Sequence, residues 1–172
     1  IKDVTILQVG NSPERLAAMA AGKVYGSILS LSQTPRAKKL GLRVLADLSR
    51  IDAEYPQGVL YVSASLIEKR PDLIRDFLKA YVEGIRQFKT NTQMAYSVIE
   101  KNTGLKDSGE IEEYHSILTK NFLLSYPLPT VAGIRTVLDD LGTKNPKVRD
   151  IKPEDLIETR FLRELKESGF IK

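Results

Sequence analysis

Short apolar runs alternate with helix signals in the first third of the chain. Four runs rich in β-branched and apolar residues, bounded by glycine or polar turn residues, predict strands at 3–9, 24–31, 42–48 and 59–63. Between them, Ser12 and Pro13 mark the start of a helix over 13–21, and Thr34 begins a short basic helix that ends at Gly41. Strands and helices alternating at this spacing favour a parallel sheet covered by helices.

A helical period takes over after the predicted strand at 59–63. From Pro71, apolar residues recur at steps of three and four and predict a long helix. Further helices are expected at 92–102, 109–122, 130–141 and 158–168. The change of composition between 52 and 58 is the best internal boundary, separating an α/β part at 1–54 from a mostly helical part at 55–172. Three parallel strands leave edges and one face exposed, so the α/β part needs other polypeptide to cover it.

Composition narrows the chemistry that the chain can perform. The 172 residues are 42% hydrophobic and 28% charged, which is typical of a folded protein. With no cysteine there is no disulfide, thiolate-bound zinc, iron–sulfur cluster or thiol nucleophile. With His115 as the single histidine, a two-histidine metal site is impossible, and a surface position is the simpler interpretation. We therefore assign no catalytic residue, metal or cofactor.

Charge and hydropathy give no sign of nucleic acid or membrane. The net charge of +4 is mild, and acidic residues are interleaved with the cations. A nucleic-acid interface needs a one-signed face with aromatic residues on which bases stack, and the sequence has no such pattern. No apolar run approaches the roughly 20 residues that span a bilayer. We therefore predict that the partner is not nucleic acid and that the given sequence contains no membrane-spanning segment.

A first candidate ligand loop joins the strand at 3–9 to the helix that follows it. Gly10 allows close approach, and free backbone N–H groups at Asn11 and Ser12 would point outward at the positive end of the helix. In open α/β sheets, ligands bind beyond the carboxyl ends of the strands. The loop therefore predicts contact with an anionic or polar ligand. A plain strand-to-helix loop with a good cap is the alternative.

Two further segments carry candidate residues. Ser30, Ser32 and Gln33 end the strand at 24–31 and should lie beside the first loop, at the same sheet edge. Helix capping before the next proline is the alternative for these three. Tyr55 lies between segments of different character, in a hinge or crossover, and could form the wall of a cleft. A solvent-exposed linker is the alternative for Tyr55.

The residues now described resemble a known family. The run 3–16 looks like the second-lobe segment of ABC-importer substrate-binding proteins, in the nitrate/sulfonate/taurine group with its thiamine-precursor-binding relatives. Other segments similar to that family are 21–24, 37–47, 65–81, 126–134, 152–155 and 161–170. No single motif is sharp, but the order and spacing of these runs cover nearly the whole chain. One departure is Tyr25, which stands where much of the family has a carboxylate.

The resemblance implies a partial α/β fold of the type II periplasmic-binding-protein kind. By it, 1–54 is the latter half of lobe two, and 55–172 is the hinge strand with the helical C-terminal part of lobe one. The family's chains are longer, so the N-terminal strands of both lobes would be missing here. A missing N-terminal half, or a second copy of the chain, would then complete the cleft. The crossing at Asp52–Gly58 would act as a hinge during lobe closure.

The resemblance also implies a function. The intact protein would capture a small anionic or polar organic solute without catalysis or cofactor. It would deliver the solute to an ABC permease, from a periplasmic or other extracytoplasmic location. Gly10, Asn11 and Ser12 match the loop that commonly meets the anionic group, and Ser30 and Ser32 match the second loop of that lobe. Two alternatives are an enzyme like the thiamine-pyrimidine synthases of the same fold, and a periplasmic sensor or interaction domain.

Overall fold

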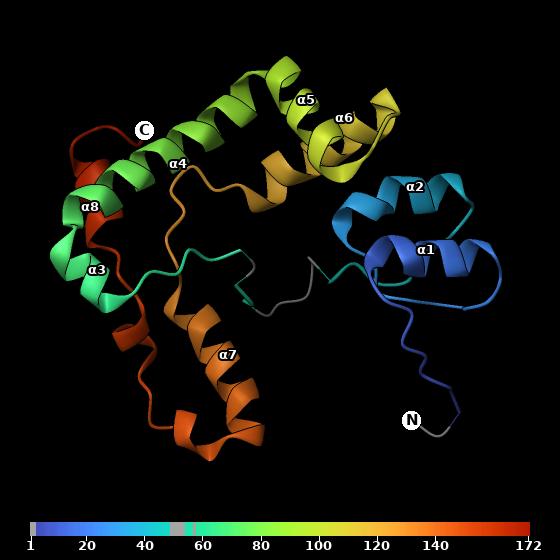
Figure 1. Cartoon of the computed structure of the whole chain (residues 1–172), viewed down its shortest axis with the longest axis horizontal. Helices are drawn as coiled ribbons and strands as arrows, with labels where there is room; N and C mark the ends of the chain where they lie inside the picture. Colours follow the sequence, from blue (N-terminus) through green and yellow to red (C-terminus); the bar gives the residue numbers. More distant parts are fainter. Residues whose placement is uncertain (1–2, 49–53, 57) are drawn as a thin grey trace. The chain divides into compact units, whose positions relative to one another are not determined.

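The computed structural model describes residues 3–48, 54–56 and 58–172 as two compact units (Figure 1). Unit 1 comprises Ile1–Asp47 and Gln93–Lys120, and unit 2 comprises Leu48–Thr92 and Asn121–Lys172. The helices α1, α2, α5 and α6 span Ser12–Ala20, Thr34–Lys39, Thr92–Thr103 and Ser108–Ile117. The helices α3, α4, α7 and α8 span Ala64–Lys69, Pro71–Thr90, Val131–Lys144 and Arg160–Glu167. Short turns of helix are η1 (Leu31–Gln33), η3 (Leu118–Phe122), η4 (Pro146–Val148) and η5 (Pro153–Leu156).

The expected sheet is absent from the described residues. None of the segments expected as strands, 3–9, 24–31, 42–48 and 59–63, forms a strand there, and Leu31 begins η1 instead. The prediction of an α/β, type II periplasmic-binding-protein-like fold is therefore wrong. A strand needs a neighbouring strand for its N–H and C=O groups, and a β-branched composition cannot supply that neighbour.

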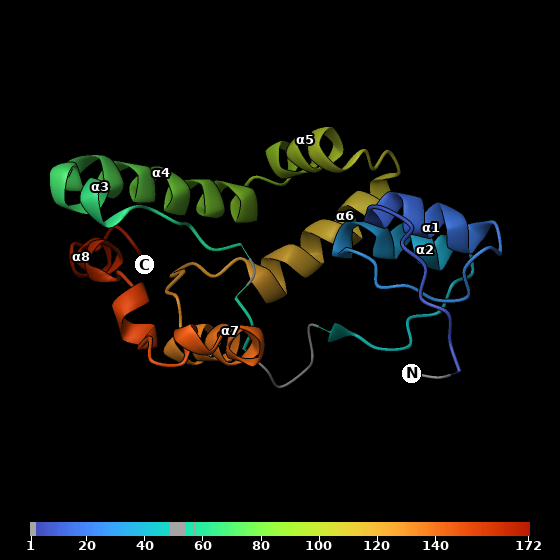
Figure 2. The ribbon, with the colours of Figure 1, turned by 60° about the horizontal axis from the view of Figure 1, so that its bottom comes forward.

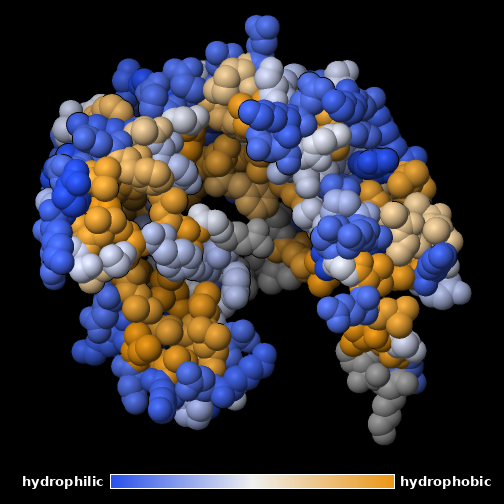
Figure 3. All heavy atoms as spheres, viewed as in Figure 1, coloured by the Kyte–Doolittle hydropathy of each residue, from blue (hydrophilic) through white to orange (hydrophobic). Residues whose placement is uncertain are grey.

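The side chains of these segments show the same lack of partners. Ile6 is 81% exposed, Leu45 is 91% exposed and Tyr61 is 89% exposed. Among the described residues, 22 large hydrophobic side chains are exposed and 13 hydrophobic residues are buried. Figure 3 shows apolar patches at the surface of both units. Apolar surface on this scale is typical of polypeptide that packs against something else.

The expected helices are confirmed, each within a few residues at its ends. The long helix expected from Pro71 is α4, and the helices expected later in the chain are α5, α6 with η3, α7 and α8. The helix α3 has no counterpart in the sequence prediction. Ser63 is its N-cap, and the Ser63 Oγ accepts a hydrogen bond of 3.3 Å from Leu66 N. A serine N-cap of this kind is readable in the sequence.

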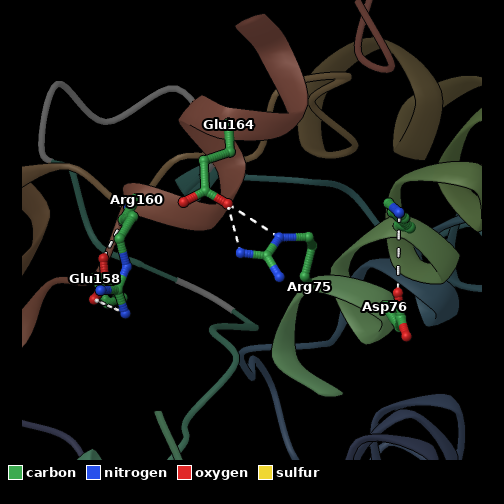
Figure 4. Close-up of polar contacts among 6 residues, drawn as sticks. Arg75, Asp76, Glu158, Arg160 and Glu164 are labelled. Carbon is green, nitrogen blue, oxygen red and sulfur yellow. Dashed lines mark hydrogen bonds and ion pairs between the residues drawn. The ribbon is translucent and has the colours of Figure 1, made fainter. Parts of the chain in front are cut away.

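Unit 2 has an apolar core between α4 and α8, which lie side by side (Figures 1 and 2). Its buried and partly buried members are Val82, Leu162, Leu165, Ile171, Leu78, Tyr126 and Leu128. At the edge of this core, Arg75 donates from Nε and Nη2 to Glu164 Oε2, at 3.1 and 3.0 Å (Figure 4). The guanidinium groups of Arg75 and Arg160 also lie over the fully buried ring of Phe161. The core thus joins α4 to α8, and Arg75 and Glu164 at its edge are 89 residues apart in sequence.

Unit 1 joins the N-terminal segment to α6 through ion pairs. Lys39 Nζ lies 2.8 Å from Asp107 Oδ2 and 3.4 Å from Glu110 Oε1, and Lys38 Nζ lies 2.5 Å from Glu113 Oε1. Buried apolar residues on and beside these helices are Leu16, Ala37, Ala95, Ile99, Leu105 and Ile111. The units therefore divide the chain differently from the boundary between 1–54 and 55–172, because the helices of Gln93–Lys120 belong with the N-terminal segment.

Candidate functional site

The first two candidate loops meet in unit 1. Ser12 is the first residue of α1, and its Oγ accepts a hydrogen bond of 2.7 Å from Ser30 N. Ser30 Oγ lies 3.2 Å from Ser32 Oγ, within hydrogen-bond distance. We call Gly10, Asn11, Ser12, Ser30 and Ser32 the serine cluster. The expected closeness of the two loops is found, but it arises where α1 contacts η1 rather than at a sheet edge.

The members of the serine cluster differ in burial. Ser12 is 8% exposed, and its hydroxyl is occupied in holding the second loop. Ser30 is exposed and Ser32 is half-buried, so their paired hydroxyls remain within reach of solvent. The arrangement therefore offers hydroxyl donors and acceptors at the surface, and the buried Ser12 holds their loop in place through its hydrogen bond with Ser30 N. Such a pair of hydroxyls suits the recognition of polar groups.

The N-terminus of α1 is capped differently from the expectation. The N-cap is Asn11 rather than Ser12, and Asn11 Oδ1 accepts a hydrogen bond of 3.1 Å from Glu14 N. In return, Asn11 N donates to Glu14 Oε2 at 2.9 Å, which completes a capping box. The expectation of a free Asn11 N–H is therefore wrong. A solute anion at this end of the helix would also meet the negative charge of Glu14.

Gly10 is tied to the same carboxylate. Its φ of +77° lies in the left-handed region, which strains any residue with a Cβ. A Cβ added to Gly10 would also overlap Glu14 Oε2. The expected close approach at Gly10 is thus made by the chain's own glutamate.

Sequence reasoning missed Arg15 as a candidate. Arg15 Nε is shielded from solvent and has no hydrogen-bond partner among the described residues. Arg15 follows Ser12 by three positions on α1, so the two residues share a face of the helix. Gln33, which the sequence did suggest, is 8% exposed at the end of η1. The sequence has no signal that singles out this arginine, because the shielding of its Nε is seen only in the structure.

Tyr55 belongs to unit 2, whereas the serine cluster belongs to unit 1. The Tyr55 side chain is 58% exposed. Its neighbours are fixed to α7: Thr130 Oγ1 donates to Glu54 Oε2 at 2.5 Å, and a Cβ on Gly133 would lie 3.3 Å from Pro56 Cδ. Three residues of the expected hinge, Asp52, Ala53 and Gln57, lie outside the described residues.

Other features of the described residues give no second site. Two hollows of about 370 and 260 Å³ are lined largely by charged residues, the first around α8 and the second around the start of α6. Neither includes the serine cluster. Among the residues that the structure describes, no group of His, Cys, Asp and Glu could hold a metal ion. Within the same part of the chain, no helix is long and apolar enough to cross a bilayer.

Comparison with known proteins gives no assignment. No protein-family model, no curated protein and no solved structure matches the chain. The resemblance to importer binding proteins therefore stays a prediction from the residue runs.

Proposed function

We propose that the chain is a non-catalytic solute-binding component of an ABC importer. Its ligand is a small anionic or polar organic solute, received at the serine cluster. The observation that carries the proposal is the hydrogen bond between Ser12 Oγ and Ser30 N, which brings two loops 18 residues apart into one surface. The resemblance in the order of the residue runs supports the importer, the ABC permease as partner and the extracytoplasmic location.

The cluster divides into a positioning residue and contact residues. Ser12 is buried and fixes the second loop, while the Ser30 and Ser32 hydroxyls, 3.2 Å apart, are available to a solute. Each hydroxyl can donate one hydrogen bond and accept others, which suits a polar head group of either charge. Net contributions of about 0.5–1.5 kcal/mol per hydrogen bond give modest affinity from these groups alone.

Further polypeptide is part of the proposal. The cluster lies outside the hollows described above, and the helix-free segments near it expose Ile6, Leu7 and Ile28. Apolar side chains on such segments support a covering polypeptide, either another part of the binding protein or a second copy of the chain. That polypeptide would supply the remaining walls of the site.

The decisive experiment is calorimetric titration of the chain with taurine, methanesulfonate and nitrate. Joint replacement of Ser30 and Ser32 by alanine should weaken binding about tenfold, because two hydrogen bonds are lost. Ser27→Ala is the matched control, since Ser27 is an exposed serine of the same segment. Ser12→Asp should also weaken binding of the anions, because it adds negative charge to the cluster. Unchanged affinity in the Ser30/Ser32 variant would remove the cluster from the site.

A native mass spectrum of the same material tests the covering polypeptide. A dimer, or a complex with another polypeptide, is expected if the exposed apolar segments have a partner. A stable bare monomer at micromolar concentration would contradict that part of the proposal.

A further inference from the structure

The helix α4 carries apolar residues beyond those that pack on α8. Four of them, which we call the α4 stripe, are Leu73, Phe77, Ala80 and Gly84. Steps of four, three and four place them on one face of the helix. In the described part of the chain Leu73 is 44% exposed and Phe77 is 54% exposed, and the two small residues are exposed as well. The helix therefore has more apolar surface than its own core uses.

Gly84 is a separate sign that another backbone approaches this face. A glycine in the interior of a helix destabilises the helix relative to alanine. The φ of Gly84 is not positive, and a Cβ added to it would have no atom of the described chain within 4 Å. The fold of the chain itself therefore does not require glycine at this position. A second helix that packs closely against the stripe does require a small residue there.

The sizes of the stripe residues suit pairing with a second copy of the same helix. The large residues lie in the N-terminal half of the stripe and the small ones in the C-terminal half. In an antiparallel pair with a two-fold axis midway between Phe77 and Ala80, Leu73 of each copy faces Gly84 of the other, and Phe77 faces Ala80. Each layer then holds one large and one small side chain, which gives even packing. A parallel pair would instead place Phe77 on Phe77 and Gly84 on Gly84.

We propose that the chain forms a homodimer in which the α4 stripes of two copies pack antiparallel against each other. The stripe extends about 16 Å along the helix axis, so the buried area is at the lower end of the range for specific interfaces. The dimer is therefore weak and depends on protein concentration. The α4 stripe belongs to unit 2, so the proposal does not rest on the solute site of unit 1.

The charged edge of the stripe gives the antiparallel arrangement a signature. Asp76 and Glu83 border the stripe on one side, and in the antiparallel pair Asp76 of one copy lies near Glu83 of the other. Each acid already has a cation on its own helix, Lys79 for Asp76 and Arg86 for Glu83, so the edge carries both signs and allows pairing. Asp76→Lys should strengthen the dimer about fivefold, because each lysine then faces a glutamate of the other copy.

Sedimentation equilibrium of the full chain between about 10 and 500 µM tests the proposal. The average mass of the unmodified chain should rise with concentration from that of one chain toward that of two. Gly84→Leu should weaken association about tenfold or more, because the leucine overfills the layer with Leu73. Its melting temperature should stay equal or rise, since leucine favours the helix and the added atoms have open space. Arg86→Leu is the control, because it adds leucine on the opposite face of α4.

A compensating substitution tests the pairing itself. Adding Leu73→Ala to Gly84→Leu exchanges large and small within one layer, so it should restore the dimer. Failure of this double variant to associate would overturn the antiparallel arrangement. A chain that stays monomeric over the whole range, or a Gly84→Leu variant that associates as well as the unmodified chain, would overturn the proposal. So would a Gly84→Leu variant with a lower melting temperature, because the stripe would then be covered by another part of the same chain.

Discussion

The α4–α8 core of unit 2 and the helix-free segments of unit 1 use the same apolar residue types with opposite results. Leu162 and Leu165 are nearly fully buried between two helices, whereas Leu45 and Ile6 are almost fully exposed. A helix satisfies its own backbone groups and needs only one apolar face covered. A strand needs neighbours on its edges as well as a covered face. An apolar run is therefore buried only where the rest of the chain supplies what its backbone requires.

The largest effect that separates the two regions is expected from a pair of leucine-to-alanine substitutions. Leu162→Ala removes a buried side chain from the unit 2 core and should lower the free energy of unfolding by about 2–5 kcal/mol. Leu45→Ala removes an exposed side chain of the same size and should change it by less than about 0.5 kcal/mol. Urea denaturation followed by circular dichroism measures both. Similar losses for the two variants would mean that the segment around Leu45 is packed in solution.

A smaller effect is expected where a helix-free segment is fixed to a helix. Thr130 caps α7 by accepting from Gly133 N at 3.1 Å and donates to Glu54 Oε2 in the segment 54–56. Thr130→Ala should destabilise unit 2 by about 1 kcal/mol, because the helix loses its cap and the segment loses its anchor. Thr130→Ser keeps the hydroxyl and serves as the control. An alanine variant as stable as the serine variant in thermal unfolding would show that neither contact contributes.

The smallest effect concerns the exposed ion pairs of unit 1, which join α2 to α6 and its N-cap. The hydrogen bond from Lys39 holds the pKa of Asp107 below its usual range, and the Glu110 backbone N–H adds to this. Because the folded-state pKa is lowered, the stabilisation is present above the unfolded pKa of about 3.9 and is lost as pH falls through the folded value. Melting temperatures between about pH 5 and 2.5 should fall less steeply in Asp107→Asn, which keeps the N-cap.

The control for this acid dependence is Asp76→Asn. Asp76 is an exposed residue of unit 2 whose carboxylate lies 3.9 Å from Lys79 Nζ (Figure 4). Replacement of Asp76 should leave the dependence of melting temperature on pH unchanged. Equal slopes for the unmodified chain and Asp107→Asn would show that the Lys39–Asp107 contact contributes nothing to stability.

The sequence predicts the helices well because their signals are local. Pro71 opens α4, and the apolar steps of three and four that follow are one face of that helix, part of which packs on α8. The strand prediction fails because strand formation depends on partners that a run such as 42–48 cannot specify by itself. Local composition showed only that these segments are apolar and β-branched.

The candidate site was predicted in part. Ser12 and Ser30 do come together, but through a helix–turn contact instead of the carboxyl edge of a sheet. The capping role of Asn11 was missed because Ser12-Pro13 is also a plausible start, and only the reciprocal bonds with Glu14 decide between them. Arg15 cannot be recognised from the sequence, because the shielding of its Nε and the lack of a hydrogen-bond partner are seen only in the structure.

Arg75 illustrates how one side chain can restrict which sequences are compatible with this core. The edge of its guanidinium donates two hydrogen bonds to Glu164, while the group as a whole lies over the Phe161 ring. Lysine carries the same charge but has neither the fork nor the flat face, so it can keep only one of the two contacts. Among diverging sequences, arginine at position 75 should persist as long as Glu164 and Phe161 do, and the three positions should change together. Arg75, Phe161 and Glu164 would then evolve as one coupled group rather than as three independent positions.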